Sequence, residues 1–196
     1  MNITVNAEVY CSDGFYGHVT RIIVNPATEA VTYVVVQQQG LFSHTWLVPI
    51  GHIIRSTSGR AELDLSTQAV KSQLRPFIKT EYLAPDLPDT LYTDGFVWQH
   101  LIANLELKTL EHENVPLHEL ALHQGSVVQA TDGIIGHLQQ IVMNDEDKHI
   151  TQIVIRAGRW LAHSQFAVPV AAIDHFAPDA IFLAVNKQEA EALAVA

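Results

Sequence analysis

The 196-residue sequence contains a single cysteine, Cys11, which excludes an internal disulfide and any cysteine-rich zinc site. We expect Cys11 to be a small core or barrel-rim residue, with a reactive thiol as the alternative interpretation. Charged residues are scarce, at 16% of the chain, whereas hydrophobic residues make up 48%, a balance typical of a folded globular protein.

Basic residues are the scarcer charge, with 11 Lys and Arg against 21 Asp and Glu, for a formal net charge of −10. Binding to nucleic acid needs clustered Lys and Arg to replace the counterions along the phosphates. The sequence has no such cluster, so we expect no direct contact with nucleic acid.

Long apolar runs are also missing. The apolar stretches are too short to cross a bilayer, and the opening residues MNITVNAEVY have neither the basic start nor the apolar centre of a signal peptide. These features predict a soluble, cytoplasmic protein without a transmembrane segment, although peripheral association with a membrane complex stays open.

Motifs of common catalytic sites are missing as well. The sequence has no phosphate-binding loop, no dinucleotide-binding glycine pattern and no serine nucleophile elbow. The stretch HELALH (118–123) resembles a zinc-protease motif, but its two histidines are five residues apart instead of four, so they do not share a helical face. We therefore predict no catalytic residues, no metal site and no cofactor.

A repeated segment is the most informative feature of the sequence. SDGFYGHVTRIIVN (12–25) and TDGIIGHLQQIVMN (131–144) both read Asp-Gly-x-x-Gly-His, then an apolar run, then Asn. The similarity continues to VTYVVV (31–36) and ITQIVI (150–155), and then to LVPI (47–50) and AVPV (167–170). This is an internal duplication of a unit of about 70 residues, long enough to be two tandem domains instead of a solenoid.

Each copy predicts an all-β domain that ends in a short helix. Val, Ile, Thr and Tyr dominate short runs bounded by turn residues, and many short strands at such spacing favour a small closed barrel. We expect Gly14 and Gly133 to supply a positive φ in tight turns after Asp. The final helices are expected to start at Ser66 and at Asn186, which has Glu189 in capping-box position.

These motifs resemble the PRC-barrel domain, found in the cytoplasmic part of the photosynthetic reaction-centre H subunit and in a bacterial ribosome maturation factor. The resemblance covers residues 6–72 and 125–192. It is carried by one set of residues in each copy: Asp13, Gly14, Gly17, Val48 and Pro49, and Asp132, Gly133, Gly136, Val168 and Pro169. The resemblance implies a six-stranded barrel that mediates protein contacts and has no catalytic set to transfer. We expect no counterpart of the H subunit's N-terminal membrane helix or of the ribosome factor's different first domain in this sequence.

The expected architecture is therefore all-β, with two tandem six-stranded PRC-type barrels, each with a C-terminal helix. We assign residues 1–75 to the first barrel, 76–124 to an acidic, proline-punctuated and ordered connector, and 125–196 to the second barrel. Two similar barrels would form a pseudo-dimer within one chain.

Two pairs of repeated histidines allow two interpretations. His18 and His137 follow the second glycine of each motif, and His44 and His163 follow each central hairpin. They are either barrel-rim residues with structural hydrogen bonds, or they meet between the barrels as a pH-responsive or metal-binding contact.

The sequence favours a non-enzymatic protein that acts as an interaction or assembly module for an unknown protein partner. A barrel this small has an interior filled by side chains, which leaves little room for a substrate. The alternative is a metal- or small-ligand-binding protein that uses the rim histidines. The predicted partner-contact residues, for which core packing is the competing interpretation, are Trp46, Tyr82, Tyr92, Phe96, Trp98 and Trp160.

Overall fold

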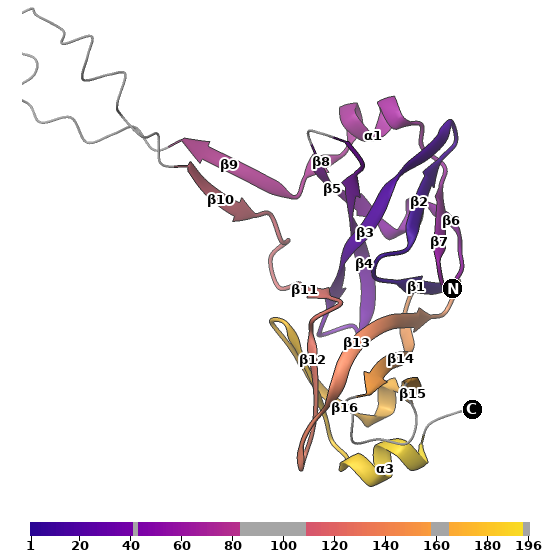
Figure 1. The fold of residues 1–196 in the computed structure, drawn as a ribbon, viewed down its shortest axis with the longest axis vertical. Helices are drawn as coiled ribbons and strands as arrows, with labels where there is room; N and C mark the ends of the chain where they lie inside the picture. The colour runs from indigo at the N-terminus through magenta and orange to yellow at the C-terminus, as the bar shows by residue number, and fades with distance from the viewer. Residues whose placement is uncertain (41–42, 83–108, 158–164, 194–196) are drawn as a thin grey trace, which may run out of the picture. The chain divides into compact units, whose positions relative to one another are not determined.

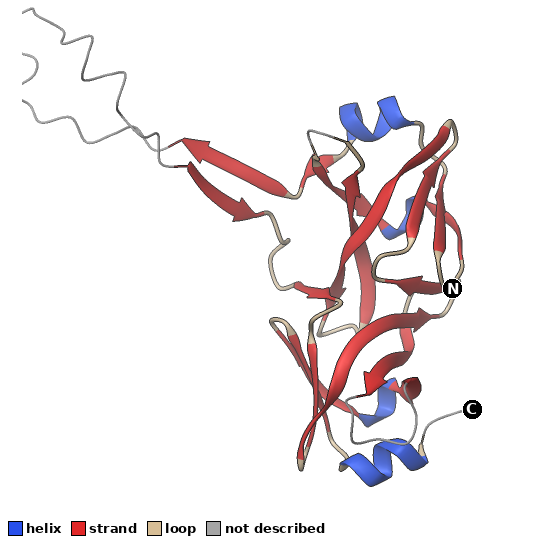
Figure 2. Cartoon of the chain, viewed as in Figure 1, coloured by secondary structure: helices blue, strands red, loops and turns tan. Residues whose placement is uncertain are grey.

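The chain is mainly β, as predicted (Figure 2). The computed structural model describes all residues except 41–42, 83–108, 158–164 and 194–196. Two compact units are present, one formed by Met1–Phe77 with Val115–Ala196 and the other by Ile78–Asn114. Across the described ranges, no helix is long and apolar enough to span a membrane.

The first half of the larger unit is a curled sheet with the order β6-β7-β2-β3-β4-β5-β8 (Figure 1). Neighbouring strands are antiparallel except β2 and β7, which are parallel. In chain order, the first half contains β1 (Asn2–Thr4), β2 (Glu8–Cys11), β3 (Gly14–Asn25), β4 (Ala30–Gln38), β5 (Thr45–Pro49), the 3-10 turn η1 (Ile50–His52), β6 (Ile53–Ser56), β7 (Arg60–Leu63), α1 (Thr67–Gln73) and β8 (Arg75–Pro76).

The second half has the matching order β15-β14-β13-β12-β17-β16, again with one parallel pair, β12 and β17. Its elements are β11 (Leu120–His123), β12 (Val127–Ala130), β13 (Gly133–Met143), β14 (Ile150–Ala157), β15 (Gln165–Pro169), η3 (Val170–Ala172), β16 (Ile173–Ala177), β17 (Ala180–Leu183) and α3 (Lys187–Ala192).

The two halves also match in their irregularities. The register between β2 and β3 shifts after Val9, and that between β12 and β13 shifts after Val128, which is 119 positions later. The hydroxyl oxygens of Thr32 and Thr151 lie 3.3 and 3.2 Å from the carbonyl oxygens of Ile23 and Val142. Bulges re-aim side chains and fix register, so bulges at corresponding positions give the two halves the same strand geometry.

Each half contributes one strand to the sheet of the other. β1 pairs with β13, with Ile3 opposite Ile141, and β11 pairs with β3, with Leu122 opposite Ile22. The two pairings correspond at an offset of 119 residues, so the exchange is reciprocal.

Because of this exchange, apolar residues of both halves pack in one core of the larger unit. Ile3 and Leu122 are fully buried, and both belong to one apolar cluster that contains inward-facing residues from both halves. Full burial of such a side chain stabilises the fold by about 1.5–3 kcal/mol. A second, smaller cluster consists of Ile23, Val35, Leu47 and Phe77.

The smaller unit contains an antiparallel hairpin. β9 (Ile78–Tyr82) pairs with β10 (Thr109–Glu113), in a register that runs from Ile78 opposite Glu113 to Tyr82 opposite Thr109. The predicted connector, residues 76–124, thus contains this hairpin and also β11, which is a strand of the larger unit.

The predicted helix starts are confirmed. Ser66 caps α1 and accepts a hydrogen bond from the Ala69 N–H. Asn186 caps α3 in a complete capping box with Glu189. Such caps satisfy backbone N–H groups that have no partner inside the helix.

Candidate functional site

The Asp-Gly pair of each motif holds a turn and a helix together. Gly14 and Gly133 have φ values of 137° and 125°, as predicted for the tight turn. The Asp13 carboxylate accepts the Thr67 N–H at 3.0 Å and the Thr67 hydroxyl at 2.9 Å, and these contacts lower its pKa. Asp132 accepts the Lys187 N–H at 3.0 Å. Both aspartates therefore bind the first turn of a helix, a contact that the sequence interpretation did not include.

The second glycine of each motif allows two backbones to approach closely. A Cβ atom at Gly17 would lie 1.9 Å from the Gln37 carbonyl oxygen, and one at Gly136 would lie 2.2 Å from that of Arg156. Because the contacted atoms are backbone, a side chain at either position would force the neighbouring strand to move. Both glycines therefore have a structural role, because they allow neighbouring strands of the sheet to pack closely.

Cys11 and Tyr16 are buried together in the first half. Burial, and secondarily the Asp13 carboxylate, raises the pKa of the Cys11 thiol to about 11. Burial also raises the pKa of Tyr16 to about 12. A thiol with a raised pKa is a poor nucleophile, which favours the structural interpretation of Cys11.

His18 lies on β3 within an aromatic surface cluster. Its half-buried ring meets the Phe15 ring edge-on at 5.5 Å, and Phe15 meets Tyr10 at 5.3 Å. The Arg60 guanidinium lies 3.9 Å from the centre of the Tyr10 ring and pairs with Glu62 at 3.0 Å. The cluster packs against itself and leaves Phe15 40% exposed.

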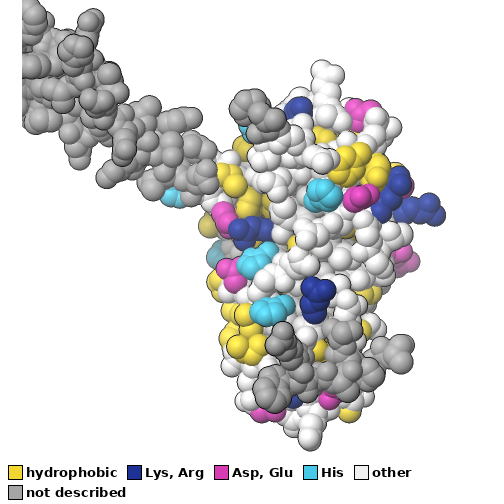
Figure 3. All heavy atoms as spheres, viewed as in Figure 1, with side chains coloured by type: hydrophobic (Ala, Val, Ile, Leu, Met, Phe, Trp, Pro, Cys, Tyr) yellow, Lys and Arg dark blue, Asp and Glu magenta, His cyan; other side chains and the backbone are white. Residues whose placement is uncertain are grey.

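His137, at the corresponding position of β13, is exposed and has different neighbours. Its Nδ1 lies 3.2 Å from the Gly125 carbonyl oxygen, which can only accept, so Nδ1 carries the proton. Directly opposite His137 on β14 is Arg156. Figure 3 shows histidine side chains beside Lys or Arg side chains over the middle of the face in view.

Among the described residues, the remaining predicted histidines form no metal site. His44 is exposed, with its ring 6.3 Å from that of Trp46, and His163 lies outside the described residues. Within the described part of the chain, no hydrogen bond or ring contact joins His18, His44 and His137 to one another. The same part contains no group of three or more His, Cys, Asp and Glu that could hold a metal ion.

Of the six predicted contact aromatics, only Trp46 has a described side chain. It lies on β5, packs against the main core, and its enclosed Nε1 has no hydrogen-bond partner. Tyr82 ends β9, but only its strand position is described. The other four, Tyr92, Phe96, Trp98 and Trp160, lie outside the described residues.

The stretch that resembled a zinc-protease motif is not a helix. Leu120–His123 is strand β11, and His118 has a positive φ of 65°. His123 Nδ1 accepts the Gly125 N–H at 2.7 Å, and its Nε2 contacts the Asp179 carboxylate at 3.1 Å. This histidine therefore fixes the turn between β11 and β12.

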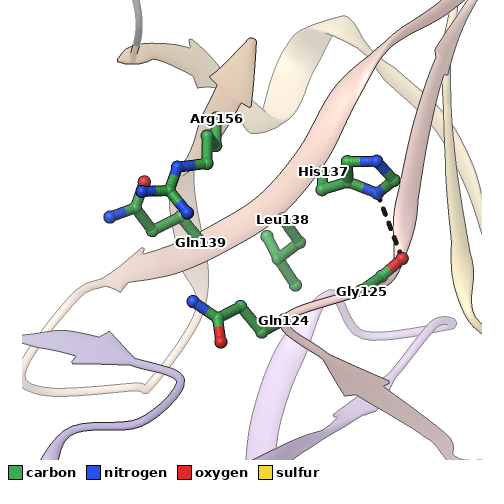
Figure 4. Close-up of a pocket in the computed structure, with 6 residues that line it drawn as sticks. All are labelled: Gln124, Gly125, His137, Leu138, Gln139 and Arg156. Atoms are coloured by element: carbon green, nitrogen blue, oxygen red, sulfur yellow. Dashed lines mark hydrogen bonds between the residues drawn. The ribbon is translucent and has the colours of Figure 1, made fainter. Parts of the chain in front are cut away.

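A pocket of about 400 Å³ lies beside this turn (Figure 4). Its lining residues are Gln124, Gly125, His137, Leu138, Gln139 and Arg156. The sequence interpretation identified only His137 among them, because strand pairing brings together residues that the sequence separates by up to 32 positions.

No protein-family model matches the sequence, and no curated protein matches it.

Proposed function

We propose that the chain is a duplicated PRC-barrel-type protein that acts without catalysis, as an interaction or assembly module for another protein. Its two six-stranded barrel-like halves would form a pseudo-dimer within one chain. Cytoplasmic location stays a prediction from the sequence.

The main support is the reciprocal strand exchange. β1 and β11 occupy corresponding places in the two sheets, with the same register at an offset of 119 residues. Two copies of one unit that were built as a symmetric dimer would pair in this way. The matched bulges and the two helix-binding aspartates support the same origin.

The motif residues support a non-catalytic role. The aspartates bind helix starts, the second glycines permit close strand approach, and Cys11 is buried with a raised pKa. The inward-facing side chains fill one continuous core. This arrangement favours outer surfaces for recognition, as the family resemblance implies.

Affinity capture by the full chain from the source cells tests this function, with a set of alanine variants at the predicted contact residues. If Tyr92, Phe96 and Trp98 contact a partner, their substitution should abolish capture of one defined protein without lowering the melting temperature. Trp46→Ala should instead lower stability by about 3–5 kcal/mol, because Trp46 packs on the core.

Ile54→Ala is the matched control. Ile54 is 64% exposed and apolar but is not a predicted contact residue, so capture and stability should both stay unchanged. Capture that no aromatic substitution affects would count against the proposed surface.

A further inference from the structure

The pocket beside β13 has a basic lining within an acidic protein. His137 and Arg156 are direct neighbours across β13 and β14, so their side chains project from the same face with Cβ atoms about 5 Å apart. No Asp or Glu is among its lining residues. Within the described residues, Arg156 forms no ion pair.

Gln139 supplies an unsatisfied acceptor at the same place. Its side-chain Oε1 is enclosed and has no hydrogen-bond partner among the described residues. An enclosed acceptor without a donor is unfavourable, so a ligand that donates a hydrogen bond there would remove this penalty. Gln139 and Arg156 both line the pocket, and Figure 4 shows their side chains next to each other.

The first half of the chain lacks this combination. At the positions corresponding to Arg156 and Gln139 it has Gln37 and Thr20, and the Thr20 hydroxyl already donates to the Val35 carbonyl oxygen at 3.3 Å. The position corresponding to Gln124 is Val5. A purely structural role would be expected in both halves, whereas this set of polar groups belongs to the second half alone.

We propose that this pocket binds a small oxyanion that also carries a hydrogen-bond donor, either a hydroxy-carboxylate or a phosphate. The Arg156 guanidinium pairs with the oxyanion through parallel hydrogen bonds. The His137 ring, held by the Gly125 carbonyl oxygen, lines the same pocket. The ligand hydroxyl donates to Gln139 Oε1. The volume of about 400 Å³ is at the lower end for small-molecule sites.

Titration of the full chain with three probes tests the proposal, with binding measured by calorimetry and by NMR shifts of the Gly125 amide. The probes are malate, succinate and inorganic phosphate. Succinate has the two carboxylates of malate but no hydroxyl, so malate should bind more tightly than succinate. Whether malate or phosphate binds more tightly distinguishes the two sources of the oxyanion.

Arg156→Gln should weaken binding of malate or phosphate by about tenfold or more, since it removes charge-assisted hydrogen bonds. Gln139→Leu should remove the preference for malate over succinate. Arg75→Gln, at an exposed arginine outside the pocket, should leave binding unchanged.

Absence of binding at millimolar concentrations of all three probes would overturn the proposal. So would binding that Arg156→Gln leaves unaltered, or equal affinity for malate and succinate. Because the pocket and the predicted aromatic contacts involve different residues, either proposal can fail without the other.

Discussion

Glycine at positions 17 and 136 keeps two strand backbones in contact at the start of each long strand. The space that a methyl group would need is occupied by a carbonyl group of the next strand. The first glycine of each motif is required for a different reason, its positive φ. One motif therefore contains two glycines with separate physical causes.

Gly17→Ala and Gly136→Ala should each lower the free energy of unfolding by about 1–3 kcal/mol, the usual cost of overpacking, because the facing backbone must shift. Chemical denaturation measures this loss. Gly59→Ala is the control, because a Cβ there meets no atom within 4 Å and Gly59 does not have a positive φ. Equal stability of all three variants would contradict the packing argument.

Cys11 predicts how stability depends on alkaline pH. Its folded pKa of about 11 is above the ordinary value of 9.0 because burial disfavours the thiolate. Below about pH 9 the raised pKa of Cys11 makes its full contribution to the stability of the folded state. This contribution is lost as pH rises toward 11, because the thiol of the unfolded chain loses its proton at a lower pH than the thiol of the folded protein. Cys11→Ala should reduce the loss of stability between these pH values.

Denaturation midpoints at several alkaline pH values would measure this effect. Alanine is a suited replacement because Ala130 occupies the corresponding buried position of the second half. Identical pH profiles of wild type and variant would show that Cys11 does not contribute. Tyr16, with its pKa raised to about 12, should cause part of the alkaline loss of stability in both the wild type and the Cys11→Ala variant.

At the scale of elements, each C-terminal helix is attached to the hairpin that begins its own half. The attachment is made by Asp13 to Thr67 and by Asp132 to Lys187, contacts that join residues 54 and 55 positions apart. Helices of seven and six residues are too short to be stable alone, so they depend on such tertiary contacts.

Asp13→Ala and Asp132→Ala should both lower the melting temperature, and Asp13→Ala should lower it more. The Asp13 carboxylate accepts from both the N–H and the hydroxyl of Thr67, whereas Asp132 accepts one N–H of Lys187. The pKa of Asp13 is lowered, so its contribution is present at neutral pH and is lost as pH falls through the folded pKa.

Thermal melts at neutral and acid pH test this ranking. The difference between wild type and Asp13→Ala should shrink on acidification. Glu146→Ala, at an exposed turn, is the matched control and should leave the melting temperature unchanged. A larger effect at Asp132 than at Asp13 would contradict the ranking.

At the scale of the whole molecule, the strand exchange makes the two halves of the larger unit depend on each other. Ile3 is buried against the second half's β13 and Leu122 against the first half's β3, so each half alone would expose a sheet edge and lose an apolar strand.

Separate fragments of residues 1–77 and 115–196 should therefore be unstable or self-associated, and mixing them should restore the native fold. Circular dichroism and analytical ultracentrifugation would follow the recovery. Ile3→Asp in the first fragment or Leu122→Asp in the second should prevent it, because each places a charge in the core. A stable, monomeric fold for either fragment alone would contradict the interdependence.

The sequence by itself determined the local structure. The β-rich composition, the turns at Gly14 and Gly133, and the helix starts at Ser66 and Asn186 follow from residue preferences that act within a few positions. The repeated motif also predicts the two sets of corresponding strands.

Only the tertiary structure decided which distant residues meet. The exchange of β1 and β11, the attachment of the helices by Asp13 and Asp132, and the pairing of His137 with Arg156 all depend on strand register. Register is selected by burial of many side chains at once, and one sequence pattern is compatible with several pairings. The motif therefore identified His137, and the fold supplied the arginine that faces it.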